Sequence, residues 1–267
     1  MSKTIGIAGM GWLGLPLAHQ LQTLGYTVKG SVSTPEKGAQ LRANGWDVFP
    51  MTLTEKGVDG NAEGFLKNVT DLVIMIPPGL RRNTGSDYVL KMTHFLEAIV
   101  KSEVQNVIFI SSTSVYGDDQ GTVTEKDTPK PENEAGRQLK QVEQLFFAAG
   151  FNATVVRFGG LYGGSRQPVR YLAGRENLSG SNAPVNLIHR DDCINILSQI
   201  ILKNSFGHIF NAVHPDHPTK EVYYTQKARE LGLTPPHFAA PLEGASYKQV
   251  DSDNLSKILG YSFNSSL

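Results

Sequence analysis

Three glycines with a fixed spacing are the first residues that indicate chemistry. Gly9, Gly11 and Gly14 fit the pattern G-x-G-x-x-G, directly after a short apolar segment and before leucines at helical spacing. In such a turn the first glycine permits the tight bend, the second lets the backbone approach a diphosphate, and the third lets helix and strand pack closely. Amides at the positive end of the helix then bind phosphate oxygens. The pattern predicts a dinucleotide site that includes Trp12 and Leu13.

The next segment bears on the choice between NAD and NADP. NAD-selective sites place Asp or Glu about 20 residues after the glycines, to bind the ribose 2′-hydroxyl. The corresponding residues 29–34 contain no acid. Ser33 and Thr34 could bind a 2′-phosphate, with the charge of Lys37 nearby. The sequence therefore favours NADP, unless these residues simply cap the next helix.

Further candidate ligands follow other expected strands. Pro77 and Pro78 follow an apolar strand at 71–76, and Ser111 ends another. Ligands of open α/β sheets bind outside the carboxyl ends of the strands, so we expect these three residues beside the cofactor. Arg81 follows the prolines, where its guanidinium could bind a substrate phosphate or carboxylate. An exposed loop would explain Arg81 equally well.

The elements that must position these residues are visible in the apolar pattern. Expected strands lie at 4–8, 26–32, 46–49, 71–76, 104–111 and 153–158, and expected helices at 13–24, 35–44, 86–101 and 134–149. Strands separated by helices predict βαβ units and a parallel sheet. Continuously apolar strands are typical of a sheet that helices cover on both faces. We therefore predict an α/β fold, with a Rossmann-like doubly wound parallel sheet.

The second part of the chain has a different texture. Glycines are frequent after residue 158 and periodicity is weak, with helices expected at 191–202, 220–231 and 253–259 and a strand at 208–213. We expect an NAD(P)-binding Rossmann domain over residues 1–160. A smaller, irregular substrate lobe would occupy residues 161–267 and partly return to the sheet. In this lobe Arg166 and Arg170 are either anion ligands or solvent-exposed side chains.

Residues 111–117, Ser-Ser-Thr-Ser-Val-Tyr-Gly, resemble a segment of the extended short-chain dehydrogenase/reductases, the group of NAD-dependent epimerases and dehydratases. Other segments resemble this family in the same order along the chain: 155–157 with 161–163, 186–192, 210–211 and 257–261. The resemblance implies an oxidoreductase or epimerase-like activity on a sugar nucleotide or a small carbonyl compound. It places Ser112 at the substrate hydroxyl and lets Tyr162 approach from the substrate lobe.

The proton-transferring pair of this family, Tyr-x-x-x-Lys, is missing where the resemblance would place it. Gly136 and Glu143 match the family pattern and fix the register, so the Tyr position is Ala135 and the Lys position is Leu139. Lys140 is one residue away, about 100° around the helix. The chain therefore resembles an atypical member of the family that lacks the pair.

Hydride transfer to or from a carbonyl needs a proton partner. The remaining candidates are Ser112, Tyr116 and His189, the last because histidine titrates near neutrality. Packing would explain Tyr116 as well, and ordering of the chain before a helix would explain His189. Two alternatives stay open: a non-catalytic NAD(P)-binding sensor or regulatory protein, and, from residues 5–14, a relative of the β-hydroxyacid dehydrogenases, which have a long all-helical C-terminal domain.

Composition limits the expected partners. The 267 residues include 25 Lys and Arg and 25 Asp and Glu, so no overall positive field would attract nucleic acid or an anionic membrane. The single cysteine, Cys193, fits a reducing compartment, and we expect no metal site. No signal peptide is visible, and the longest apolar run, 72–78, is shorter than the roughly 20 residues of a membrane span. We expect a cytoplasmic protein with a small-molecule substrate; its oligomeric state is not predicted.

Overall fold

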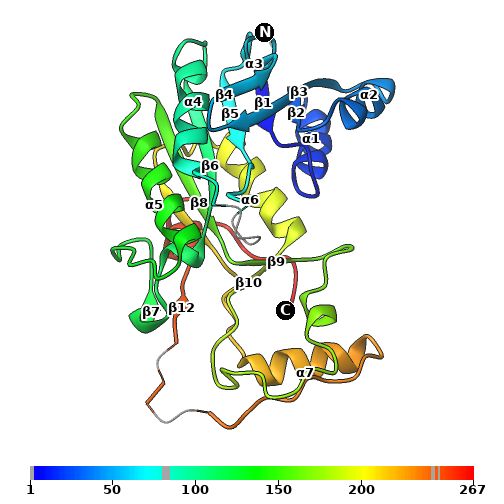
Figure 1. The fold of residues 1–267 in the computed structure, drawn as a ribbon, viewed down its shortest axis with the longest axis vertical. Coiled ribbons are helices and arrows are strands. Elements are labelled where there is room, and N and C mark those ends of the chain that lie inside the picture. Colours follow the sequence, from blue (N-terminus) through cyan, green and yellow to red (C-terminus); the bar gives the residue numbers. More distant parts are fainter. Residues whose placement is uncertain (1–2, 80–84, 242–243, 246) are drawn as a thin grey trace.

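The computed structural model of the chain describes residues 3–79, 85–241, 244–245 and 247–267 (Figure 1). Its main sheet contains β1 (Thr4–Ala8), β2 (Thr27–Val32), β3 (Asp47–Thr54), β4 (Gly57–Gly60), β5 (Asp71–Ile74), β6 (Asn106–Ser112), β8 (Asn152–Phe158) and β11 (Ile209–Ala212). The strand order is β11-β8-β6-β5-β1-β2-β3-β4. Neighbours pair in parallel, except β3 with β4. The predicted Rossmann-like doubly wound sheet is confirmed.

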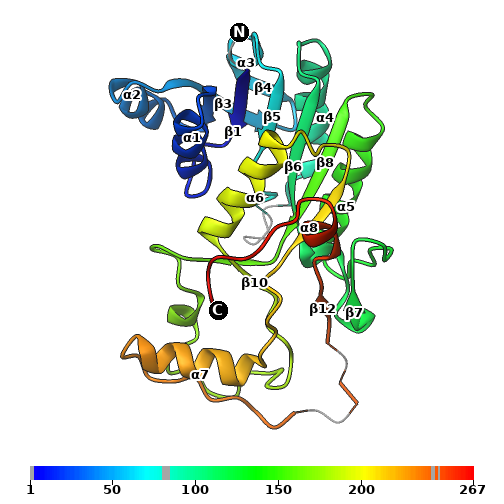
Figure 2. The same ribbon diagram turned by 180° about the vertical axis from the view of Figure 1, so that it is seen from behind.

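Helices cover both faces of this sheet (Figures 1 and 2). One face carries α1 (Gly14–Thr23), α2 (Pro35–Ala43), α6 (Arg190–Leu202) and α8 (Asp253–Lys257), and the other carries α3 (Ala62–Leu66), α4 (Tyr88–Val100) and α5 (Glu134–Phe147). Successive strand residues contribute to opposite faces: Val73 lies in the first apolar cluster, whereas Leu72 and Ile74 lie in the second. This arrangement explains why the central strands are apolar throughout rather than alternating.

The third strand is longer than the sequence predicted. We expected residues 46–49, but β3 continues to Thr54 and turns back as β4, which pairs antiparallel with it. β3 includes Pro50, although proline cannot donate to a ladder. This proline stands where the pairing changes: β3 pairs with β2 up to Pro50 and with β4 from Met51 onward. A missing amide is tolerated at such a point.

The second half of the chain contributes to both the sheet and a separate lobe. β11 joins the sheet beside β8, and α6 packs against α1. The lobe holds α7 (Lys220–Glu230) and the parallel pair β9 (Gly160–Tyr162) and β10 (Leu187–His189), while β12 (Gln249–Val250) pairs with β7 (Thr122–Val123). Short 3-10 helices lie at Thr113–Val115, Asp118–Gln120 and Pro168–Tyr171. These late strands differ from the all-helical domain of the β-hydroxyacid dehydrogenase alternative. The expected boundary at residue 160 stays a prediction.

Asn186 connects three segments where the lobe meets the sheet, through its main chain and its side chain. The main-chain oxygen of Asn186 accepts a hydrogen bond from the amide of Gly160 at 2.7 Å. Its side-chain nitrogen donates to the carbonyl of Lys248 at 3.0 Å, and its side-chain oxygen accepts from the amide of Val250 at 2.8 Å. The junction is therefore held by hydrogen bonds as well as by chain continuity.

Among the described residues, no helix is both long enough and apolar enough to cross a bilayer.

Candidate functional site

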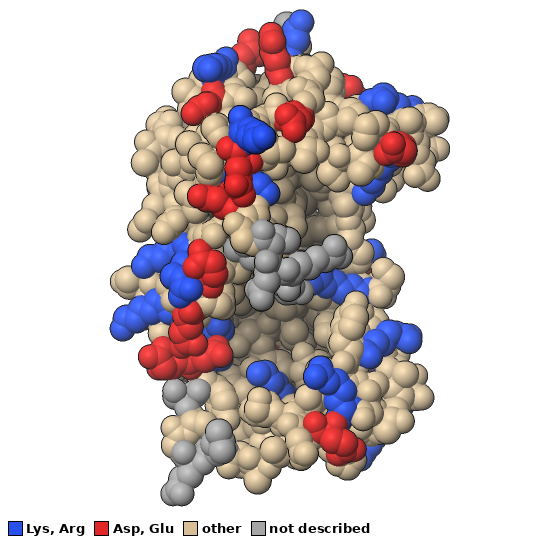
Figure 3. All heavy atoms as spheres, in the orientation of Figure 1, with Lys and Arg blue, Asp and Glu red and all other residues tan. Residues whose placement is uncertain are grey.

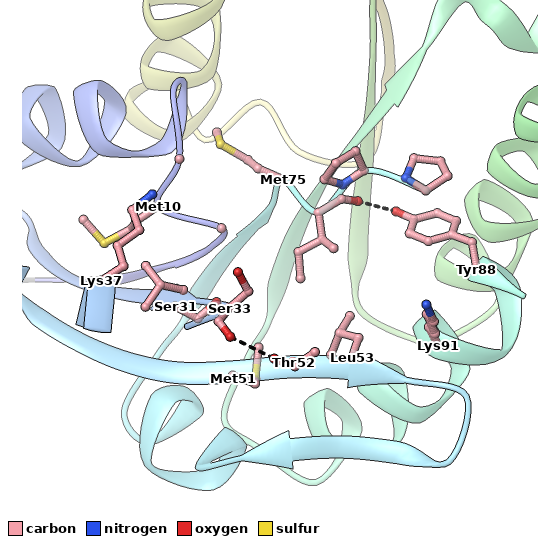
Figure 4. A pocket seen from close by; sticks show the side chains of 16 residues that line it. Met10, Ser31, Ser33, Lys37, Met51, Thr52, Leu53, Met75, Tyr88 and Lys91 are labelled. Atoms are coloured by element: carbon pink, nitrogen blue, oxygen red, sulfur yellow. Dashed lines mark hydrogen bonds between the residues drawn. The ribbon is translucent and has the colours of Figure 1, made fainter. Parts of the chain in front are cut away.

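A cleft of about 330 Å³ lies at the carboxyl ends of β1, β2, β3 and β5 (Figure 4). β1 lies between β2 and β5, so the strand order reverses here, and in open α/β sheets ligands bind at such a reversal. Five of the predicted cofactor residues line the cleft: Gly9, Gly11, Ser33, Pro77 and Pro78. These five residues therefore lie around one crevice, and their binding of a cofactor stays a prediction.

The glycines of the first turn differ in what the protein itself requires of them. Gly9 has φ +111°, and a Cβ on it would lie 3.1 Å from the carbonyl oxygen of Met75. A Cβ on Gly14 would lie 2.2 Å from the carbonyl oxygen of Gly9, which is closer than any real contact. A Cβ on Gly11 would meet no atom of the described residues within 4 Å. Internal packing therefore explains Gly9 and Gly14, whereas Gly11 leaves space on the cleft side of the turn.

The start of α1 keeps donors available. It begins after Leu13 without a side-chain cap and has no acidic residue in its first turn. Within the described residues, the amides of Trp12 and Leu13 donate no hydrogen bond. Unpaired amides at the positive end of a helix attract anions. The donor set thus fits the diphosphate that the glycine pattern predicts.

Two of the residues that favour NADP lie in the cleft, on the side away from Tyr88 and Lys91 (Figure 4). Ser33 and Lys37 both line it, and the hydroxyl of Thr52 donates to the carbonyl of Ser33 at 3.1 Å. The Thr34 hydroxyl instead accepts a hydrogen bond from the amide of Lys37 at 3.4 Å, at the N-cap of α2. The alternative of a helix cap thus describes Thr34, while Ser33 and Lys37 remain at the cleft.

Tyr88 and Lys91 also line the cleft, and neither was predicted from the sequence. They begin α4, and the Tyr88 hydroxyl donates to the carbonyl of Ile76 at 2.6 Å. Burial raises the pKa of Tyr88 well above its usual value, so it stays a neutral donor that fixes the chain before the prolines. The signal was available, because the helix after a strand begins at the carboxyl end of the sheet.

The two serines that end β6 have different surroundings. The Ser111 hydroxyl donates to Glu143 at 2.5 Å, and the side chain is buried, so of this residue only the backbone could reach a cofactor. Ser112 is half-buried, and its hydroxyl oxygen accepts a hydrogen bond from the amide of Ser114 at 3.1 Å. Of the predicted serines, Ser112 keeps a hydroxyl proton to donate at the carboxyl end of the sheet.

Tyr116 is enclosed by the protein. It is 1% exposed, and its hydroxyl lies 2.9 Å from the carbonyl of Thr124 and accepts from Arg157 at 2.6 Å. Burial raises its pKa, which the Arg157 charge opposes. A hydroxyl so surrounded supports the fold and does not reach the cleft.

The positions of the expected catalytic pair lie on α5. Ala135 is half-buried and Leu139 is buried in the apolar cluster on that face of the sheet. Packing accounts for one of the residues that fixed the register, since a Cβ on Gly136 would lie 2.2 Å from the carbonyl oxygen of Ser114. Lys140 donates to the carbonyl of Pro129 at 3.0 Å, away from the cleft lining. The absence of a working pair stays a prediction from the register.

The lobe candidates are tied to the chain terminus. The ring nitrogen Nδ1 of His189 accepts from the amide of Asp191 at 3.3 Å, which caps α6. The Tyr162 hydroxyl donates to the carbonyl of Ser266 at 2.8 Å, and burial raises the pKa of Tyr162 to about 12. Neither contact is with the cleft. The predicted Arg81 lies outside the described residues.

Comparison with known proteins gives relatives over the whole chain. The model of the family described as "NAD dependent epimerase/dehydratase family" matches residues 5–175. The chain is 34% identical to Protein YeeZ of Escherichia coli strain K12, over 98% of this chain and 96% of that protein. Among solved structures, UDP-glucose 4-epimerase from Thermotoga maritima, with UDP-glucose, matches with a TM-score of 0.81 at 16% identity, covering 98% of this chain and 94% of that one. UDP-glucuronic acid 4-epimerase from Bacillus cereus, in complex with NAD, matches with a TM-score of 0.80 at 19% identity, covering 98% and 92%.

Proposed function

Because the chain belongs to the NAD dependent epimerase/dehydratase family, we propose that its cleft binds a nicotinamide dinucleotide for a redox or epimerase-like reaction. The observation that carries the proposal is the turn at Gly11. Its open side faces the cleft, beside the unpaired amides of Trp12 and Leu13 in the described structure. Diphosphate binding needs both the space and the donors.

The preferred cofactor in this proposal is NADP. Ser33 supplies a hydroxyl and Lys37 a positive charge at the cleft, and Thr52 occupies the adjacent strand position. A 2′-phosphate gains from such groups, whereas a ribose 2′-hydroxyl usually binds a carboxylate. The structure of the Bacillus cereus epimerase is in complex with NAD, which argues for NAD in place of NADP.

For the reaction, we propose a sugar nucleotide or a small carbonyl compound as substrate. UDP-sugars are named for the two epimerases of similar fold. When bound, the nicotinamide ring would accept or return a hydride. Ser112 would hold the substrate hydroxyl at the end of β6, since its side chain is half-buried and on the correct edge of the sheet. Tyr116 would not act as the proton partner, because it is enclosed.

The second candidate function, an NAD(P)-binding sensor without catalysis, is favoured by one observation. Leu139 is buried among apolar side chains and Ala135 carries no titratable group, so neither position transfers protons. Such a protein would bind the dinucleotide and leave substrates unchanged.

Calorimetry with NADP and NAD, followed by cofactor absorbance with a panel of UDP-sugars and small carbonyl compounds, tests these proposals. We expect binding of both cofactors with NADP tighter, and turnover that Ser112→Ala reduces at least tenfold while binding is kept. Preference for NAD would reject the NADP assignment. Binding without turnover would reject the enzymatic proposal and support the sensor function. Failure to bind either cofactor would exclude both functions.

A further inference from the structure

Two arginines from the second half of the chain lie over the indole ring of Trp12, in the glycine turn. The guanidinium carbon of Arg166 is 5.5 Å from the ring centroid, and that of Arg190 is 5.6 Å from it. The two come from different segments, Arg166 from the loop after β9 and Arg190 from the first residue of α6. A guanidinium within about 6 Å of a Trp ring is attracted to its face. The ring thus places both charges beside the turn that begins α1.

The lobe backbone is built to hold these side chains there. Gly163 and Arg166 exchange two main-chain hydrogen bonds, at 2.9 and 3.1 Å, which close a tight turn. Gly164 has φ +55°, and a Cβ on it would lie 2.9 Å from a terminal nitrogen of Arg190. The glycine therefore lets the turn and the Arg190 guanidinium come together. The local backbone thus restricts where both arginine side chains can lie.

The positive charge at this place is poorly compensated. Arg166 forms no ion pair with any described residue, and Arg190 has only the exposed Asp191, at 3.5 Å. The Nε of Arg190 is buried without a hydrogen-bond partner among the described groups. The first turn of α1 adds no acidic residue. Lys and Arg side chains also gather on the lobe side of the hollow seen in Figure 3. Two guanidiniums and a helix start together favour a multiply charged anion.

We propose that Arg166 and Arg190 bind the diphosphate of the dinucleotide from the lobe side, opposite the amides of Trp12 and Leu13. This inference rests on the proposed function and extends it, because the glycine pattern alone assigns the diphosphate to the backbone of α1. The lobe would then hold the cofactor as well as the substrate. Cofactor affinity becomes dependent on residues outside the Rossmann part of the chain.

Binding of three probes to Arg166→Ala and Arg190→Ala tests the proposal. The probes are NADP and ADP-ribose, which contain a diphosphate, and adenosine, which contains none. Calorimetry would measure the first two, and saturation-transfer NMR the third. Arg175→Ala is the matched control, since Arg175 is an exposed arginine of the same lobe with no aromatic contact in the described structure.

Each variant should lose roughly tenfold in affinity for NADP and ADP-ribose, the factor expected for one charge-assisted contact. Its affinity should also depend less steeply on salt than that of the wild type. Adenosine binding and Arg175→Ala should be unchanged. If Arg166→Ala and Arg190→Ala bind ADP-ribose as tightly as Arg175→Ala does, the proposal is overturned. It is also overturned if they lose as much affinity for adenosine as for ADP-ribose, because such a loss would indicate a damaged fold. No binding of NADP or ADP-ribose by the wild type would overturn the proposed function as well.

Discussion

At the scale of single residues, two glycines of the first turn should respond in opposite ways to the same substitution. Gly11→Ala adds a methyl group that meets no atom in the described part of the chain, so the free energy of unfolding should change by less than about 1 kcal/mol. The methyl group would, however, occupy the approach of the diphosphate, and we expect cofactor affinity to fall at least tenfold. Urea denaturation and calorimetry on the same sample separate the two effects.

Gly14→Ala is the matched control for this experiment. Its methyl group would lie 2.2 Å from the carbonyl oxygen of Gly9, so the helix must move away from the strand. We expect a loss of about 1–3 kcal/mol of stability, as for other overpacked sites. If Gly11→Ala also destabilised the protein and kept its affinity, the turn would serve packing alone.

The same pattern shows how far the site could be predicted from sequence. Glycine spacing identified Gly9, Gly11 and Gly14 because each backbone role requires the absence of a side chain. Tyr88 could not be recognised by type, since its role depends on a hydrogen bond to Ile76, twelve residues earlier. Arg190 was likewise not singled out, because its neighbour Trp12 is distant in the sequence.

At the scale of elements, a buried ion pair joins α5 to β8 and β6. Arg157 donates to both carboxylate oxygens of Glu143, at 3.0 and 2.6 Å, and Ser111 donates to the same carboxylate. The side chains of Arg157 and Glu143 are only 3% and 4% exposed. Removing one partner of such a pair leaves a buried charge without compensation.

Glu143→Gln should therefore lower the free energy of unfolding by about 3–5 kcal/mol. Glu134→Gln, on the same helix, changes a carboxylate that pairs with Arg137 at 2.9 Å in an exposed position. It should lower the free energy of unfolding much less than Glu143→Gln, because water and salt screen an exposed pair. Guanidinium denaturation of both variants gives the comparison, and equal effects would contradict the structural importance of the buried pair.

Element boundaries show which signals the sequence lacked. The longer helices and the central strands were predicted within a few residues, because their apolar spacing persists over several turns or over a whole strand. The short helix α3 was not predicted. β7, β9, β10 and β12 have two or three residues each, too few for any period. β4 contains two glycines and an aspartate in four residues, a composition that favours turns, and its partner β3 supplies the order.

At the scale of the whole molecule, Tyr162 connects the lobe to the C-terminal segment through Ser266. Burial raises its pKa from 10.0 to about 12. Below pH 10 the phenol is neutral in both states and has no pH effect. Above it the unfolded chain loses the proton first and binds fewer protons, so stability falls as the pH rises towards 12.

Tyr162→Phe should remove this contribution. The variant would lose about 1 kcal/mol at neutral pH with its hydrogen bond, but it should lose less than the wild type between about pH 10 and pH 12. Urea denaturation at several alkaline pH values measures both slopes. Parallel slopes would show that Tyr162 ionises equally in the folded and unfolded chain.

The amide of Asn186 has a consequence for how anything enters between sheet and lobe. Asn186 binds Gly160 through its main-chain oxygen and the 248–250 segment through its side chain, and these segments lie far apart in the sequence. Hydrogen bonds at several points of this junction oppose a hinge motion of the lobe relative to the sheet. We therefore expect the opening between sheet and lobe to have the same width before and after a ligand binds. The side chains at its rim, and not a closing movement of the lobe, would then determine which ligands enter.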